Sequence, residues 1–190
     1  AKIKKATDAI VILKHYSEKL QEIIENVSST TDLEEVGTYT AEREVKKVLF
    51  IVVTSNKGLA GAFNSSVIKE LNHAISNTKH EVEILSVGKK VYEAIRKNRT
   101  VYDNQSAIFD SMSFEAVSNF MEHVMKDYRE GKFDKVFVIY NKFINAATQE
   151  VKTEQVLPIK MAEKTAGANT DYIFEPNAKE ILDVLIPKSI

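Results

Sequence analysis

The first 28 residues have the hydrophobic pattern of one long helix without glycine or proline. Apolar residues recur at the a and d positions of four heptads, with Ser17 as the single polar a position. These positions are Ile3, Ala6, Ile10, Leu13, Leu20, Ile24 and Val27, and the stripe is widened by Val11, Ile12, Tyr16 and Ile23. The pattern allows two interpretations: an amphipathic helix on the core of its own domain, or a coiled-coil arm that needs a partner helix.

Apolar strands and helical periods alternate from residue 45 to residue 160, after a polar stretch, 29–44, that we interpret as a surface connection. Residues 48–53 are apolar throughout, which is typical of a strand buried on both faces. Further strands are predicted at 81–88, 101–102 and 135–141, and an edge strand at 150–159. Helices are predicted at 59–76, 89–98 and 113–128. Ser111 or Ser113 is expected to cap the last of these helices. This alternation predicts an α/β fold, a three-layer doubly wound and mainly parallel sheet of the Rossmann-like kind.

The remaining residues are predicted to form a loop, 161–176, and the start of a C-terminal helix, 177–190. Asn177 and Glu180 have the spacing of a capping box. Ile181 and Leu185 lie on the apolar face of this helix, and Pro187 is expected to kink or end it.

Composition narrows the function classes. The chain has 190 residues, 26 Lys and Arg, and 27 Asp and Glu, so that no basic excess indicates nucleic acid. Cysteine is absent, which excludes disulfides, Cys-ligated zinc and a thiol nucleophile. No apolar run has the length of a membrane span, and no signal peptide is visible. The sequence begins with Ala1 rather than methionine, so we expect a fragment or a processed form.

A glycine loop, Ser55 to Gly61, follows the first strand and suggests a phosphate site. The spacing does not fit a P-loop, since Lys57 precedes both glycines, nor a dinucleotide loop, which needs three glycines. We therefore predict that Gly58 and Gly61 have structural roles, permitting a tight turn and close helix–strand packing.

The four histidines show no metal-binding spacing, and we predict no catalytic residue, cofactor or metal. An enzyme hypothesis rests on fold alone and places Ser55, Asn56, Gly88 and Asn141 around a crevice at the strand ends. The alternative function is thus a small nucleotide- or phosphate-binding α/β protein with a dimerising N-terminal helix.

The loop and its flanks resemble the signature region of the gamma subunit of F-type ATP synthases, which runs T-S-D-R-G-L-C/A-G-G/A-F/L-N. The matching residues are Thr54, Ser55, Gly58, Leu59, Gly61, Phe63 and Asn64, whereas Asn56 and Lys57 depart from the acid–arginine pair. Residues 136–150 and 171–187 are similar to two further stretches of that family, in the same order along the chain.

The resemblance implies a rotor subunit, the central stalk, which transmits torque between the membrane c ring and the catalytic hexamer and is not itself an enzyme. It implies contacts with the alpha, beta and epsilon subunits and the c ring, no cofactor, and a peripheral place on the cytoplasmic face of a bacterial inner membrane or the mitochondrial matrix face. It also implies an antiparallel coiled coil of the two terminal helices, whose interface would join the N-terminal stripe to Ile181 and Leu185. Because residues 178–190 are shorter than helix 1–28, we expect Ile3, Ala6 and Ile10 to form a bare end through which the chain self-associates.

Overall fold

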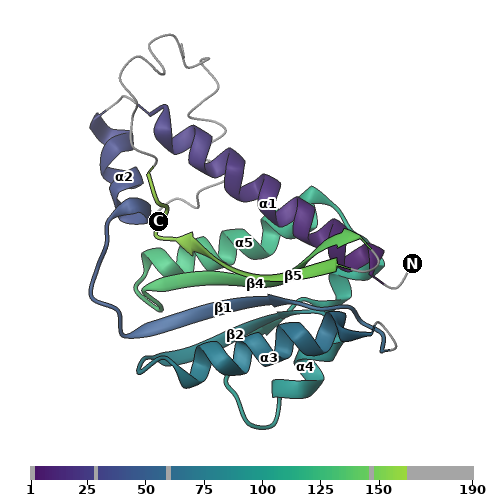
Figure 1. Cartoon of the computed structure of the whole chain (residues 1–190). Helices are drawn as coiled ribbons and strands as arrows, with labels where there is room; N and C mark the ends of the chain where they lie inside the picture. The colour runs from purple at the N-terminus through teal and green to yellow at the C-terminus, as the bar shows by residue number, and fades with distance from the viewer. Residues whose placement is uncertain (1–2, 28–29, 59–60, 146–147, 162–190) are drawn as a thin grey trace.

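The computed structural model describes residues 3–27, 30–58, 61–145 and 148–161. Its centre is a five-stranded sheet in the order β3-β2-β1-β4-β5 (Figure 1). The strands are β1 (Lys47–Val53), β2 (Glu81–Val87), β3 (Val101–Asn104), β4 (Lys135–Asn145) and β5 (Thr148–Leu157). All neighbouring pairs are parallel except β4 and β5, which form an antiparallel hairpin at one edge. The predicted mainly parallel sheet and its edge strand are confirmed.

The central strand β1 is buried on both faces, as its apolar sequence predicted. Leu49, Ile51 and Val53 point into one core, and Val48, Phe50 and Val52 into a second core on the opposite face. It pairs with β2 in parallel without a register shift, from Lys47 opposite Glu81 to Val53 opposite Val87. The carboxyl ends of both strands therefore lie at the same edge of the sheet.

Two helical layers cover the sheet. One layer consists of α3 (Ala62–Ser76) and α4 (Lys89–Ile95). The other contains α1 (Lys4–Glu25), α5 (Phe114–Arg129) and the short 3₁₀ helix η1 (Ser106–Asp110), with α2 (Thr30–Thr40) beside them (Figure 1). Of the two caps predicted for α5, Ser113 is the one used, since its hydroxyl accepts a 3.0 Å hydrogen bond from the Ala116 amide.

Helix α1 lies on the sheet and on α5, so its apolar face belongs to the core of its own domain. The buried residues of α1 are Ala6, Ala9, Ile10, Leu13, Tyr16, Leu20, Ile23 and Ile24. The prediction of a bare end at Ile3, Ala6 and Ile10 is therefore wrong: Ala6 and Ile10 are buried and Ile3 is half-buried. Three residues outside the a and d positions, Ala9, Tyr16 and Ile23, widen the buried face so that α1 packs on α5 as well as on the sheet, which a coiled-coil stripe does not need.

Self-association through that end consequently loses its motivation. Whether part of the stripe also meets a partner helix remains a prediction, since Ile181 and Leu185 lie outside the described residues. So do the predicted loop and C-terminal helix, apart from Met161.

The stretch interpreted as a surface connection contains a helix, α2, so this part of the prediction is wrong. Val36 and Tyr39, three residues apart, turn inward and are buried, and the Tyr39 ring stacks on Tyr128 with centroids 6.3 Å apart. The Tyr39 carbonyl also accepts a 2.7 Å hydrogen bond from the Ile159 amide. Two inward apolar residues and one hydrogen bond anchor a segment whose remaining residues are mainly polar and give only a weak helical signal.

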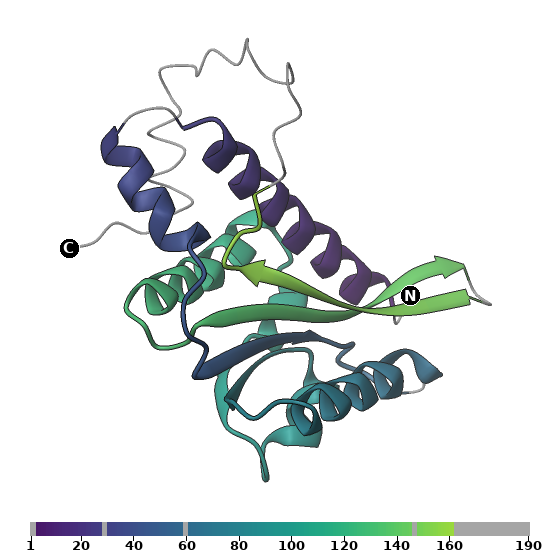
Figure 2. The ribbon, with the colours of Figure 1, turned by 60° about the vertical axis from the view of Figure 1, so that its left-hand side comes forward.

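Helix α1 runs antiparallel to the parallel strands. Gln21, late in α1, donates to the Lys160 carbonyl just beyond β5 (3.3 Å), while Ile10, early in α1, lies beside Tyr140 in the second half of β4. In both views α1 begins towards the end of the domain at which β4 ends and β5 begins (Figures 1 and 2). The carboxyl ends of β1, β2 and β4 and the first turns of α1 thus share one end of the domain.

Candidate functional site

The glycine loop follows β1 at the strand end where doubly wound domains usually bind ligands. Ser55, Asn56, Gly88 and Asn141, the four residues of the enzyme hypothesis, do lie along this edge. The question is whether they leave room for a phosphate at the start of α4, where free backbone N–H groups would attract an anion.

Those N–H groups are already used within the chain. The Lys89 amide donates to the Asn56 side-chain oxygen (2.8 Å), the Lys90 amide to the Ser55 carbonyl (3.3 Å), and the Val91 amide to Thr54 Oγ1 (3.1 Å). The loop after β1 therefore fills the space in front of the first turn of α4, and these three amides are not free to bind an anion.

Gly88 closes the remaining space because its backbone touches that of Thr54. It has φ = +130°, a region that L side chains rarely adopt, and a Cβ built on it would lie 2.3 Å from the Thr54 carbonyl oxygen. The Thr54 amide donates a 2.9 Å hydrogen bond to the Val87 carbonyl, which extends the β1–β2 hydrogen bonding by one residue beyond the end of β1. Strands β1 and β2 thus stay in backbone contact just beyond their last paired residues.

Asn64, in the first turn of α3, fastens the loop from the other side. Its Oδ1 accepts from the Ser55 amide (2.8 Å), and its Nδ2 donates to Ser55 Oγ (2.8 Å) and to the Lys57 carbonyl (3.2 Å). The side chain is 8% exposed, and these bonds satisfy both ends of the amide. A residue that the family resemblance singled out therefore has a structural role in this site.

The η1 helix and β4 complete the network. Asn56 Nδ2 donates to the Ser106 carbonyl (3.2 Å), and the Gly88 amide donates to the Ser106 hydroxyl (3.2 Å). Asn141, at the far side, donates to the Phe63 carbonyl at 3.3 Å. No sequence pattern indicated a role for Ser106 beyond its place in a short polar run after β3.

The two loop glycines differ from each other. Gly61 has φ = +58° and so meets the expectation of a special backbone conformation, although a Cβ there would meet nothing within 4 Å. At Gly58 a Cβ would only touch the Lys90 side chain, at 3.6 Å, and the close packing predicted for the loop glycines occurs at Gly88 instead. Phe63 is fully buried and packs in the core beneath α1, and Leu59 lies outside the described residues.

Replacing Asn64 by alanine is expected to lower the free energy of unfolding by about 2–3 kcal/mol, because buried partners lose their hydrogen bonds together. Asn64→Asp should lie between wild type and alanine, since it keeps the acceptor and loses the donor. Asn72→Ala, exposed on the same helix, is the matched control and should cost less than about 0.5 kcal/mol. Urea titration monitored by circular dichroism measures all three, and equal stability of the two alanine variants would contradict the assigned role.

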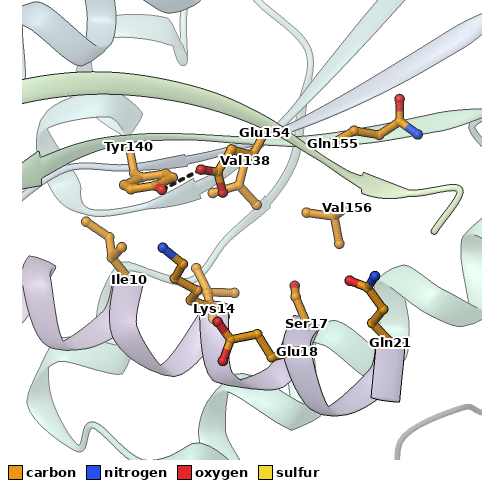
Figure 3. A pocket seen from close by; sticks show the side chains of 11 residues that line it. Ile10, Lys14, Ser17, Glu18, Gln21, Val138, Tyr140, Glu154, Gln155 and Val156 are labelled. Atoms are coloured by element: carbon orange, nitrogen blue, oxygen red, sulfur yellow. Dashed lines mark hydrogen bonds between the residues drawn. The ribbon is translucent and has the colours of Figure 1, made fainter. Parts of the chain in front are cut away.

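A second candidate is a groove of about 220 Å³ between α1 and the β4–β5 edge (Figure 3). Ile10, Lys14, Ser17, Glu18 and Gln21 line it from α1, facing side chains of the two strands. Ser17, the single polar a position, thus faces a groove rather than the dry core.

The groove has mixed chemistry without a reactive arrangement. Tyr140 donates to Glu154 at 2.8 Å, and burial, together with this bond, raises the pKa of Tyr140 above its ordinary value. A phenol held protonated beside a carboxylate neither attacks nor removes a proton near neutral pH. The groove combines apolar side chains with polar side chains at its rim. This combination suits the docking of another segment better than catalysis.

Two further searches cover the described part of the chain. Within it, no group of three or more His, Asp or Glu side chains could hold a metal ion. Among the same residues, no helix is both long and apolar enough to cross a lipid bilayer.

Comparison with known proteins agrees with the motif. A family model described as ATP synthase matches residues 1–190. The ATP synthase gamma chain of Flavobacterium johnsoniae is 45% identical over all of this chain and 67% of the relative, and that of Christiangramia forsetii is 42% identical over the same shares. In structure, the chain is similar to one in the Tetrahymena thermophila mitochondrial ATP synthase central stalk and c ring, with a TM-score of 0.54, 22% identity, and 83% and 70% of the two chains covered.

The structural likeness supports the fold, and the sequence matches extend over the whole chain. The closed strand-end network is built from Thr54, Ser55 and Asn64, which are residues of the signature that the sequence displays. Sequence and fold together place this chain in the family of ATP synthase gamma chains.

Proposed function

We propose that this chain is the globular part of a rotor, the central stalk of an F-type ATP synthase, and that it passes torque between a membrane c ring and a catalytic hexamer without catalysis of its own. The observation that carries the proposal is the packing of α1. Eight of its residues are buried in the same core as the sheet and α5, so a twist applied to the helix is passed directly to the domain.

Rigid packing suits this task. A protein interior is close-packed and resists deformation, so a sheet with a core on each face transmits strain rather than absorbing it. The strand-end network has the same effect, because it holds β1, α3 and α4 together at the end of the domain where α1 begins. A helix that continued α1 towards its N-terminal side would leave the domain at that end, on the side where β4 ends and β5 begins (Figure 2).

The partners follow from the role. We propose that the later part of α1 pairs with a C-terminal helix through Ile181 and Leu185, and that the continuation of this helix pair beyond the start of α1 enters the ring of alpha and beta subunits. The opposite end would face the c ring, and an epsilon subunit would flank the domain. This arrangement would place the protein peripherally on a coupling membrane, on its cytoplasmic or matrix side.

The first test is nucleotide binding by the chain alone. We expect calorimetric titration with Mg-ATP to give no dissociation constant below about 10 μM (about −7 kcal/mol), because the N–H groups at the start of α4 have partners within the chain. Tighter binding would favour the alternative, a small nucleotide- or phosphate-binding α/β protein.

The second test concerns the complex. The complete subunit containing this chain, mixed with alpha and beta subunits, should produce an ATP-hydrolysing complex in which a bead attached to the domain rotates. A subunit that fails to enter the complex, or a bead that stays still during ATP hydrolysis, would contradict the rotor role.

A further inference from the structure

One broad face of the domain has a strong positive charge. The α3–α4 face, meaning α3, α4 and the loops at residues 54–58, 61, 77–80, 88 and 96–100, has eight cationic and two anionic side chains, a net charge of +6. The cations are Lys57, Lys69, Lys79, Lys89, Lys90, Arg96, Lys97 and Arg99, and the anions are Glu70 and Glu93. The other described residues have 14 cationic and 20 anionic side chains, a net charge of −6, so the charge is separated across the sheet.

These cations have few partners within the chain. All eight cations except Lys90 are exposed, and Lys90 is the only one of the eight that forms an ion pair with another described residue, Glu93 at 3.4 Å. Arg99 reaches a neutral side chain, Asn72, at 3.5 Å. Side chains of like charge repel one another on one surface, a cost that an approaching anionic surface would remove.

The direction of this face indicates what can approach it. Helices α3 and α4 lie flat on the sheet opposite α1, so the α3–α4 face runs alongside the α1 axis rather than across its end (Figure 1). In a stalk built on α1 such a face points sideways, so that its surface stands roughly perpendicular to the membrane plane. A partner there must stand beside the stalk.

The chemistry of the face also disfavours a lipid surface. Large exposed hydrophobic residues in the described part of the chain are Val11, Leu33, Phe143, Ile144 and Met161, and all five lie outside the α3–α4 face. Helices that lie on membranes combine basic residues with apolar anchors, and this face lacks such anchors.

We propose that the α3–α4 face is a docking surface for an acidic protein surface, presented by a neighbouring subunit that stands beside the stalk; the inference rests on the proposed function. Exposed charge pairs of this type mainly speed association and orient the partners, since water and salt screen them once docked. The contact should therefore form fast at low salt and weaken steeply as salt is added.

The absence of cysteine permits a site-specific test in the assembled complex. Asn98→Cys, neutral and exposed on the α3–α4 face, would be the only thiol of this chain and can hold a photoreactive maleimide. In a complex whose other subunits lack reactive thiols, illumination should attach it to an Asp- and Glu-rich peptide of another subunit. Raising the salt from about 0.05 M to 0.5 M should lower the yield about tenfold.

Charge reversal provides the matched comparison. Arg96→Glu with Lys97→Glu should lower the adduct yield about tenfold at low salt, because it turns two of the eight cations into repelling groups. Lys5→Glu with Lys126→Glu makes the same change in net charge at exposed sites on the opposite layer and should leave the yield within twofold.

Each outcome has a distinct meaning. Adducts with lipid alone, or a protein adduct whose yield ignores both salt and charge reversal, would overturn the docking proposal. A chain that never enters the complex would contradict the proposed function itself, whereas a chain that assembles and rotates without a charge-dependent adduct contradicts only the docking surface.

Discussion

Gly88→Ala is expected to lower the free energy of unfolding by about 2–6 kcal/mol, more than alanine at any of the other three glycines compared below. Two costs add at this position. The backbone has φ = +130°, where an L side chain is strained by about 1–3 kcal/mol. The new Cβ would also stand 2.3 Å from the Thr54 carbonyl oxygen, and making room in packed backbone costs about 1–3 kcal/mol more.

The other glycines supply graded controls for this substitution. Gly61→Ala introduces backbone strain, because φ is +58°, but no steric clash, because nothing lies within 4 Å of the new Cβ. It should cost about 1–2 kcal/mol of stability. Gly58→Ala meets only the flexible end of Lys90 and should change stability by less than about 0.5 kcal/mol. Gly37→Ala, inside α2 with open space around it, should stabilise by up to about 1 kcal/mol.

Chemical denaturation of the four variants with a common m value gives the order directly. If Gly88→Ala proves no worse than Gly61→Ala, the backbones of Gly88 and Thr54 are not in contact at this point, and the structural role assigned to Gly88 is wrong.

The sequence predicted the type of most elements because their patterns are local. An apolar run such as 48–53 can be read as a doubly buried strand without knowing its neighbours, and β1 is that strand. The role of Gly88 could not be read in this way. It follows from the approach of Thr54, which is distant in sequence, and the two residues meet only because β1 and β2 are paired in register.

The N-terminal helix is a second case in which the local sequence pattern did not determine the contacts. Its heptads agreed with two kinds of partner, a helix or a sheet, and the spacing alone did not decide between them. The surface that covers the wide buried face of α1 is assembled from α5 and from strands far along the chain, and Tyr16, for example, packs on Phe114 of α5. Similarly, the position of α2 depends on the burial of Tyr39 against Tyr128, a contact that no local sequence pattern predicts.

Arg43 shows how such long-range contacts determine stability, and Arg43→Ala is expected to cost about 3 kcal/mol. The guanidinium joins the end of α2 to the turn between α5 and β4. It donates to the carbonyls of Tyr128 (2.8 Å) and Phe133, pairs with Asp134 at 3.2 Å, and lies 3.9 Å above the Tyr128 ring. Hydrogen bonds to a charged group contribute about 1.5–3 kcal/mol each, and here the acceptor carbonyls lie in a partly buried place.

The conservative variant separates geometry from charge at this site. Arg43→Lys should still lose about 2 kcal/mol, because one ammonium group cannot reach two carbonyls and a carboxylate while lying flat on a ring. Asp134 itself would remain satisfied, since it also accepts from the Lys46 and Lys47 amides at 2.8 and 3.1 Å. For a domain of this size the alanine variant should melt about 6–12 °C lower, and Arg96→Ala, on the exposed basic face, should melt within about 2 °C of wild type. If lysine restored full stability, the charge alone would be responsible, and the fork of contacts from α2 to α5 and β4 would not be what holds that end of the domain together.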